Sequence, residues 1–365
     1  MSGWRLLELG ALAPVMTQAI YHSVAIHVGA GVSPPTLILC YPESPLVCVG
    51  YHEDAEEDVD VQAVRRKGYP LVRRMLGGGA VLLDPGQIFY QVIIAADDER
   101  APVTIEGLFA RYLEAPVRVY RRLGIPASRR GVNDIEVDGK KISGNGAGLI
   151  EGSQVLTGNI ILSFPYDEMV QLLRVPDEKF RDKVARTLKG RLTTCRDVLG
   201  CEPDRATVLR YLVEEYSQTL EGLTPGNLSE EESETANSLC REYVTDEWVF
   251  SRSRKKRQIK LKVSERAWVG EGIHKAPGGI VRALLVVADG KIEEVSFDGD
   301  FFANPLDCID KLSLSLRGVL CQPEHVRDAI TRFLASNPVE VPGVGAEDFF
   351  RAVAASGLLT GGTKI

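Results

Sequence analysis

Three consecutive glycines, Gly77 to Gly79, constrain this chain more than any other feature of its sequence. Glycine loses the most backbone freedom on folding, so a run of glycines is expected where side chains would be in the way. Arg73 and Arg74 precede the run, and a β-rich stretch, residues 80–83, follows it. Bare N–H groups beside guanidinium groups are typical of a loop that wraps a phosphate. The pattern predicts a strand, an anion-binding loop and a strand; the alternative is a glycine-rich hairpin without a ligand.

The glycine loop differs from the two common nucleotide-binding loops. The sequence has no GxxxxGK[ST] motif here, and no GxGxxG motif that opens a helix. After a turn at residues 84–86, apolar side chains alternate along residues 88–94, which predicts a second strand. We therefore expect any nucleotide to be held on a sheet.

A second glycine-rich segment spans residues 131–148. Its Asp-Gly pair at 138–139 predicts a tight hairpin turn. Lys140 and Lys141 follow the turn, and the small residues 143–148 come next. Lysines beside a turn commonly face water, which is the simpler interpretation. Two glycine-rich loops, one with arginines and one with lysines, favour instead an anionic ligand clamped from two sides.

The composition excludes several classes of protein. The chain has 365 residues, of which 44% are hydrophobic and 25% charged, and its net charge of −7 argues against a general nucleic-acid binder. Its seven cysteines form no Cys-x-x-Cys pair, so we expect reduced thiols and no disulfide framework. Neither a signal peptide nor an apolar stretch of membrane-spanning length is found. We expect a cytoplasmic monomer that does not enter membranes.

The length favours two domains. Residues 223–246 include a polar, acidic stretch typical of a linker, between a first domain at 1–222 and a small α+β domain at 247–365. A basic run at 252–257 is interpreted as a guarded edge strand or, alternatively, as a docking site for an acidic protein. Cations around Cys195 are either a solvated helix end or a flap over an anionic intermediate. They are Lys183, Arg186, Lys189, Arg191 and Arg196.

Several motifs occur in an order that we recognise. They are Arg73-Arg74-x-x-Gly77-Gly78-Gly79-Ala80-Val81, Asn133-Asp134 and Gly139-Lys140-Lys141-Ile142-Ser143-Gly144. Together they resemble the lipoate–protein ligase family over nearly all of residues 1–200. The C-terminal segment is similar to that family's accessory domain, particularly at Gly290-Lys-Ile-x-x-Val295 and Gly299-Asp300-Phe301-Phe302.

The resemblance implies a fold and a reaction. The fold is α/β, with a mixed-sheet catalytic domain of the biotin/lipoate-ligase type and a smaller α+β accessory domain. ATP, with Mg²⁺, and lipoate or octanoate would give an acyl-adenylate. A lysine of a lipoyl-carrier protein would then take the acyl group: a dehydrogenase lipoyl domain, a glycine-cleavage carrier or a lipoate-binding protein. A carboxylate that attacks a phosphate needs cations nearby, which fits the residues above.

The resemblance also implies roles for particular residues. Lys141 matches the essential lysine that would contact the acyl carbonyl and the α-phosphate. Mg²⁺ would be held through the phosphates, with Asp134 as a candidate ligand. The nucleotide would be bound by Arg74, Gly77, Gly78, Gly79, Ala80, Val81, Leu82 and Lys141. The substrate pocket would include Val72, Arg73, Asn133, Asp134 and Gly144.

The sequence departs from the family pattern at three positions. Met75, Leu83 and Thr157 stand where many members have serine, histidine and histidine. An alternative function is therefore octanoyl or lipoyl transfer without ATP, through a Cys195 thioester. Arginines at 191 and 196 are expected to lower the pKa of that thiol. One transferase group carries its cysteine near residues 131–132, where this chain has none. A third alternative is a lipoyl-protein binding module with a decayed site.

Overall fold

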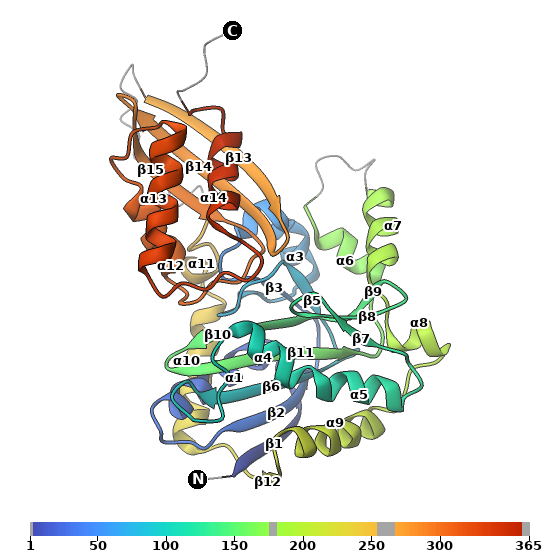
Figure 1. Cartoon of the computed structure of the whole chain (residues 1–365). Coiled ribbons are helices and arrows are strands. Elements are labelled where there is room, and N and C mark those ends of the chain that lie inside the picture. The colour runs from blue at the N-terminus through green and yellow to red at the C-terminus, as the bar shows by residue number, and fades with distance from the viewer. Residues whose placement is uncertain (1–2, 175–180, 254–266, 360–365) are drawn as a thin grey trace. The chain divides into compact units, whose positions relative to one another are not determined.

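The computed structural model describes residues 3–174, 181–253 and 267–359 (Figure 1). Its contacts divide the chain into two compact units. Unit 1 consists of Met1–Val49, Glu56–Leu76 and Ala80–Val249, and unit 2 of Gly50–Ala55, Gly77–Gly79 and Phe250–Ile365. The three consecutive glycines therefore make their contacts mainly with the C-terminal part of the chain.

Unit 1 is built on a mixed six-stranded sheet with the order β10-β11-β6-β2-β1-β12. Its strands are β1 (Trp4–Leu12), β2 (Thr36–Pro42), β6 (Gln87–Ala95), β10 (Asn145–Ile150), β11 (Ser153–Ile161) and β12 (Leu223–Pro225). β1 runs parallel to β2 and β12, and the other neighbours are antiparallel. The predicted α/β class with a mixed sheet is thereby confirmed.

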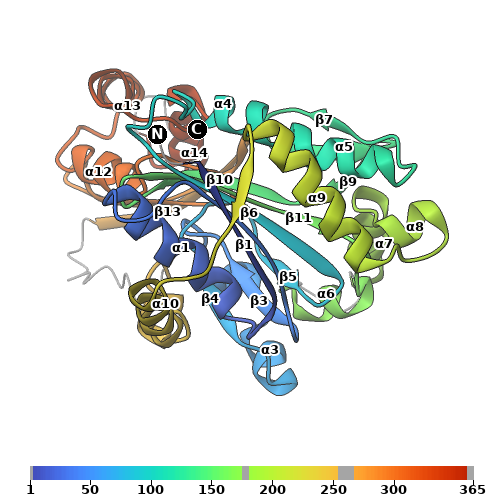
Figure 2. The same cartoon turned by 90° about the horizontal axis from the view of Figure 1, so that it is seen from below.

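Helices cover both faces of this sheet (Figure 2). One face packs on α4 (Ile105–Tyr112), α5 (Glu114–Arg122) and α9 (Arg205–Thr219). The other packs on α1 (Met16–Gly29), against which α10 (Glu230–Tyr243) lies. Residues 87–94 of β6 are therefore buried on both faces. α4 and α5 are separate helices, because Pro116 has no N–H to continue α4 but is tolerated in the first turn of α5.

Two small sheets carry the sequence motifs. The first has the order β4-β3-β5, from β3 (Leu46–Val49), β4 (Leu71–Arg73) and β5 (Val81–Leu83). The glycine loop thus joins strands on opposite sides of β3 and is not a simple hairpin. The second is the antiparallel sheet of β7 (Ser128–Arg130), β8 (Asp134–Val137) and β9 (Lys140–Ser143). Asp138 and Gly139 have φ values of 50° and 74°, as the predicted tight turn between β8 and β9 requires.

Short helices complete unit 1. They are α2 (Ala55–Asp58), α3 (Val61–Lys67), α6 (Tyr166–Leu172), α7 (Arg181–Arg191), α8 (Cys195–Leu199) and α11 (Asp246–Val249). The first residue of α2, Ala55, is counted with unit 2. Among the described residues, no helix has the length and apolar character that crossing a membrane requires.

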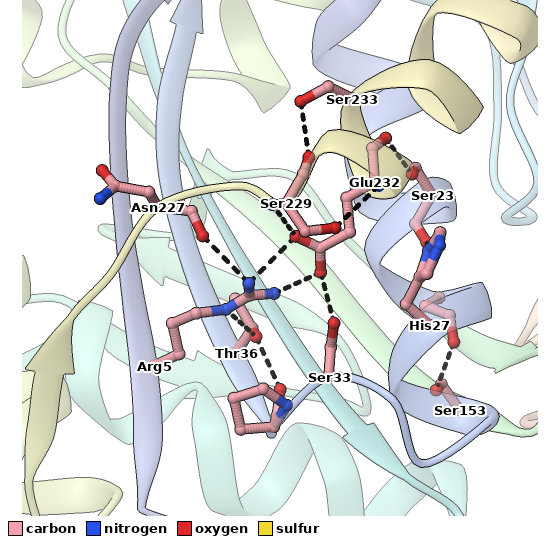
Figure 3. A network of polar contacts seen from close by, with 12 residues as sticks. Arg5, Ser23, His27, Ser33, Thr36, Ser153, Asn227, Ser229, Glu232 and Ser233 are labelled. Atoms are coloured by element: carbon pink, nitrogen blue, oxygen red, sulfur yellow. Dashed lines mark hydrogen bonds and ion pairs between the residues drawn. The ribbon is translucent and has the colours of Figure 1, made fainter.

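The segment predicted as a linker, residues 223–246, is instead an integral part of unit 1. β12 adds a strand beside β1, and α10 packs on α1. Figure 3 shows the polar network that fixes α10: Glu232 is fully buried and accepts hydrogen bonds from Arg5 Nη1 at 3.0 Å and Ser33 Oγ at 2.7 Å. The acidic composition was misleading because this glutamate points inward to a buried partner.

Unit 2 contains the small α+β domain that the sequence predicts. Its described part has three antiparallel strands in the order β13-β14-β15, covered by helices. They are β13 (Ala267–Ala276), β14 (Gly279–Ala288), β15 (Lys291–Asp298), α12 (Cys308–Ser315), α13 (Pro323–Ser336) and α14 (Ala346–Ala355). Most of the basic run at 252–257, from residue 254 onward, lies outside the described residues.

Candidate active site

Lys141 and Asp134 form an ion pair between neighbouring strands β9 and β8. Lys141 Nζ lies 2.6 Å from Asp134 Oδ1, and the two side chains are 35% and 37% exposed. The hairpin turn at residues 138–139 places these strands side by side. The ammonium group is therefore held at a fixed place while water, or an anion, can still reach it.

The backbone around Lys141 is anchored from three directions. Thr193 N donates to Lys141 O at 2.9 Å, so the segment after α7 is tied to the lysine itself. Tyr120 Oη donates to Ile142 O at 2.7 Å, and the Ile142 side chain is buried in the core. The next residue, Ser143, is also fully buried. Movement of β9 would break several buried contacts at once.

Asn133 and Asn145 hold each other's backbone. Asn133 Nδ2 donates to Asn145 O at 3.1 Å, and Asn145 Nδ2 donates to Asn133 O at 2.8 Å. Tyr90 Oη donates to Asn145 Oδ1 at 2.6 Å. A Cβ at Gly158 would lie 2.1 Å from that Oδ1 atom, so only glycine leaves room for the amide. Asn133, predicted to line the pocket, thus ties the start of β8 to β10.

Two buried amides connect the strand after the glycine loop with the turn after Lys141. Gln87 Nε2 donates to Leu82 O at 3.1 Å and to Asp84 Oδ1 at 2.9 Å. Asn159 Nδ2 donates to Gln87 Oε1 at 2.7 Å, and Gly144 N donates to Asn159 Oδ1 at 2.7 Å. Sequence reasoning missed both amides. Their signal was the presence of amide side chains, two in each strand, within the largely apolar β6 and β11.

The two arginines before the glycine loop have different environments. Arg73 is fully buried, and its Nε and Nη2 atoms donate to Val249 O at 3.1 and 2.6 Å. Trp248 Nε1 donates in return to Arg73 O at 2.9 Å. Both Arg73 and Val72 are completely buried, and Arg73 fixes the end of α11; their place in a substrate pocket stays a prediction.

Arg74 is only half-buried. Its backbone N donates to Val49 O at 3.0 Å, and its Nη1 lies 3.4 Å from Cys48 O. Arg74 follows β4 of one small sheet, whereas Lys141 lies within β9 of the other. The structure joins Asn133, Asp134, Lys141 and Gly144 in one contact network, whereas Arg74 belongs to the β3–β4 pair.

The three glycines are not equivalent. A Cβ at Gly77 would lie 2.4 Å from Phe301 O, and Gly78 has a φ of 90°. These two positions need glycine because of protein backbone, which differs from the expectation that all three make room for a phosphate. At Gly79 a Cβ would meet nothing closer than 3.9 Å. Within this run of three, Gly79 has neither a close backbone contact nor a positive φ, so it leaves space for a side chain or a ligand.

Cys195 does not have the properties of a nucleophile. It begins α8, is 0% exposed and packs in the core of unit 1. Burial raises the pKa of its thiol to about 12, so the predicted lowering by arginines is wrong. Arg191 is exposed, and Arg196 pairs at the surface with Glu202. Neither offsets the loss of water around the sulfur.

The described residues contain no group of three or more His, Cys, Asp and Glu side chains that could hold a metal ion. Mg²⁺ commonly takes one or two carboxylates and completes its shell with water and substrate phosphates. The half-exposed Asp134 fits that arrangement as a protein ligand.

Two family models match the chain. Residues 14–217 match the lipoyl protein ligase A/B catalytic domain, and residues 271–351 match the bacterial lipoate protein ligase C-terminus. The octanoyltransferase LipM of Kyrpidia tusciae is 30% identical over 273 residues, which are 68% of this chain and 99% of that protein. The lipoate-protein ligase LplJ of Bacillus subtilis is 28% identical over 73% of this chain and 76% of that protein.

Solved structures give the same picture. A bipartite lipoate protein ligase of Thermoplasma acidophilum, described together with its E2 lipoyl domain, has a TM-score of 0.62 and 28% identity over 72% of this chain and 100% of that one. A lipoate-protein ligase A bound with ATP has a TM-score of 0.58 and 26% identity over 69% of this chain and 100% of that one.

Proposed function

We propose that this chain, which belongs to the lipoyl protein ligase A/B family of enzymes, is an ATP-dependent lipoate–protein ligase. It would join lipoate or octanoate to AMP and then transfer the acyl group to a lysine of a lipoyl-carrier protein. One observation carries the choice of ligase over transferase: residues 271–351 match the C-terminus of bacterial lipoate ligases. LipM is matched along 99% of its own length by only 68% of this chain, so about a third of this chain has no counterpart in that match.

Lys141 is the proposed catalytic residue. The first step brings a carboxylate to the α-phosphate of ATP, and the two negative charges repel each other. An ammonium group held in place offsets that repulsion without having to reorganise during the reaction. The ion pair with Asp134 supplies the fixed position, and the 35% exposure of Lys141 leaves its remaining N–H donors for substrate.

The nucleotide is proposed to lie along Arg74 and the segment that runs from Gly79 to Leu82. ATP is present in one structural relative, which supports the assignment. Mg²⁺, when bound, would neutralise phosphate charge, and Asp134 is the carboxylate proposed to reach it. Asp134 would then balance two cations, Lys141 and the metal.

The proposed acceptor is a lipoyl domain, because a structural relative was described with its E2 lipoyl domain. A glycine-cleavage carrier and a lipoate-binding protein are the alternatives. The aliphatic tail of the acyl group requires an apolar lining. Met75 and Leu83, which replace polar residues of many family members, are both largely buried and add apolar surface on either side of the glycine loop.

The test measures pyrophosphate released by purified protein from ATP and lipoate or octanoate, and the intact mass of a lipoyl domain added afterwards. Lys141→Ala is expected to lower release at least 100-fold, within the range for a lost electrostatic contact. Lys140→Ala is the matched control, since Lys140 is an exposed neighbour in the same turn. Undiminished release by Lys141→Ala would remove that lysine from its role.

A second candidate function is octanoyl transfer from an acylated carrier without ATP, favoured by the similarity to LipM. The buried thiol of Cys195 does not support the thioester route first considered for it. Incubation of an octanoylated carrier with a lipoyl domain, in the absence of ATP, tests this function. Cys195→Ser is expected to leave any such transfer unchanged.

A further inference from the structure

We propose that Gln87 and Asn159 are positioning residues, which hold the Lys141 strand in register with the strand that follows the glycine loop. The bridge consists of their two side-chain amides. It rests on the proposed function for its kinetic readout, but the geometry itself belongs to unit 1 alone.

The bridge is a chain of four hydrogen bonds, and its two amide side chains are buried. It runs from Leu82 O and Asp84 Oδ1, through Gln87 and Asn159, to Gly144 N, with donor–acceptor distances of 2.7 to 3.1 Å. Gln87 is 1% exposed and Asn159 8%. Each amide oxygen accepts one hydrogen bond and each NH₂ group donates. A 180° flip of either amide would therefore place an acceptor against an acceptor or a donor against a donor.

Asn159 forms two hydrogen bonds with the end of β9, the strand that contains Lys141. Its side-chain oxygen accepts from Gly144 N, and its backbone carbonyl accepts from Ser143 Oγ at 2.7 Å. Ser143 ends β9, two residues after Lys141. Asn159 therefore fixes where β9 ends, and the ion pair with Asp134 fixes where the ammonium group points.

No contact with substrate is assigned to either amide. Their expected effect acts through Lys141, because a shift of about 1 Å at a reacting group can cost about 100-fold in rate. Asn159→Ala leaves the Gly144 N–H and Gln87 Oε1 without partners in a buried place. We expect kcat for pyrophosphate release to fall about 10- to 100-fold, with a smaller change in the KM for ATP.

Asn159→Asp gives a sharper test because it keeps the shape of the side chain. An ionised carboxylate still accepts from Gly144 N but cannot donate to Gln87 Oε1. A protonated carboxyl group has one donor and one acceptor and restores both bonds. Burial beside an acceptor favours the protonated form. The activity of Asn159→Asp relative to wild type is therefore expected to rise as the pH is lowered.

The control lies in the other buried network of unit 1. Ser23 is fully buried, and its Oγ donates to Glu232 O at 2.6 Å. Ser23→Ala also removes a buried hydrogen bond, but one on α1 and α10. We expect Ser23→Ala to lower Tm by an amount similar to that of the bridge variants and to change kcat less than twofold. Equal losses of kcat at equal losses of Tm would mean that the bridge is merely structural.

A double-mutant cycle tests whether the bridge acts through the lysine. If it does, Asn159→Ala reduces the residual rate of Lys141→Ala far less than it reduces the wild-type rate. The same fold-reduction in both backgrounds would overturn the proposal.

Hydrogen exchange keeps the test separate from the proposed function. Asn159→Ala is expected to speed exchange of the Gly144 amide at least tenfold, and Ser23→Ala to leave it unchanged. If wild type releases no pyrophosphate, the ligase assignment fails while this measurement still decides the bridge. Unchanged Gly144 exchange in Asn159→Ala would refute it, whatever reaction the enzyme catalyses.

Discussion

Two of the buried polar networks in the described part of unit 1 are built from different chemistry. The Arg5–Glu232 network pairs opposite charges and fastens α10 to the sheet (Figure 3). The Gln87–Asn159 bridge uses neutral amides and fastens strands near Lys141. Arg5 Nε donates to Thr36, and Thr36 pairs with Ile93 of β6. Ile93 is six residues from Gln87 in the same strand, which separates the two networks by about 20 Å along β6. The networks therefore lie at opposite ends of the sheet.

The difference follows from what each end has to do. At the α10 end a buried ion pair can hold the helix, because its partners Arg5, Ser33 and Thr36 include no residue proposed to take part in the reaction. Lys141 already has one carboxylate partner, Asp134, and under the proposed function a second carboxylate would compete with the anionic substrate for the ammonium group. Amides give directional hydrogen bonds without net charge, so they fix geometry and leave the cation available. The only carboxylate in the bridge, Asp84, stands at its far end, and burial is the main cause of the rise in its pKa.

The largest expected effect on stability comes from the charged network. Glu232→Ala leaves the Arg5 guanidinium, 11% exposed, without its charged partner. Breaking a buried pair by removing one member costs about 3–5 kcal/mol. Urea unfolding is expected to show this loss, whereas the exposed neighbour Glu231→Ala changes stability by less than about 0.5 kcal/mol. A loss below about 1 kcal/mol for Glu232→Ala would show that the pair contributes little.

As the pH is lowered, the first loss of folding stability is expected from His22, on α1. Burial lowers the pKa of His22, on α1, from 6.5 to about 4. Its neutral form is favoured in the folded state, so stability present above pH 6.5 is lost as pH falls toward 4, by about 3 kcal/mol at most. His22→Gln is expected to flatten this part of the curve of unfolding free energy against pH. The exposed His325→Gln is the control; equal slopes in both variants would exclude His22.

Below about pH 4.5 the charged network itself contributes. Burial opposes ionisation of Glu232, but hydrogen bonds from Arg5, Ser229 and Ser33 outweigh it and lower the pKa of its carboxyl group. A lowered pKa means that stability present above the unfolded value is lost as the pH falls through the folded one. Glu232→Gln should remove that loss, and Asn159→Ala should not.

Two buried tyrosines differ in whether the hydroxyl group forms a hydrogen bond. Tyr90 Oη donates to Asn145 Oδ1 at 2.6 Å, beside the bridge. The buried Tyr112 Oη has no hydrogen-bond partner within the described part of the chain. Tyr90→Phe is expected to cost about 1–2 kcal/mol and Tyr112→Phe about zero. Thermal unfolding of both variants checks this, and equal Tm shifts would contradict the role given to Tyr90.

The smallest expected effect has the opposite sign. The pKa of Asp84 is raised, mainly by burial, so its charged form disfavours folding at neutral pH. Asp84→Asn keeps an oxygen for Gln87 Nε2 and should raise the unfolding free energy slightly at pH 7, with the gain shrinking as the pH falls. Urea unfolding at two pH values measures it; a loss at pH 7 would mean that the carboxylate is stabilising.

Local patterns accounted for much of the fold and for part of the site. The Asp-Gly pair at 138–139 predicted the turn, and the turn placed Lys141 beside Asp134. The order of the glycine and lysine motifs led to the family that the comparisons identify. These features depend on dihedral preferences and on spacing within a few residues, which the sequence states directly.

Local sequence patterns could not predict which side chains are buried or which distant residues contact each other. Arg73 and Arg74 are adjacent and identical in type, yet one is sealed inside and the other half exposed. Cys195 lies among cations in the sequence, but its thiol packs in the core. Gln87 and Asn159 are 72 residues apart and meet only because β6 and β11 pair in one register.

The sequence alone therefore determined the family, the turn that presents Lys141 and the strands around it. Only the tertiary structure decided which arginine is buried and which is half-exposed, why Gly77 and Gly78 must be glycine, and which two amides bond to each other. The reason is physical: turns are set by neighbouring residues, whereas the loss of water around a side chain and its choice of partner depend on strands that meet from distant parts of the chain.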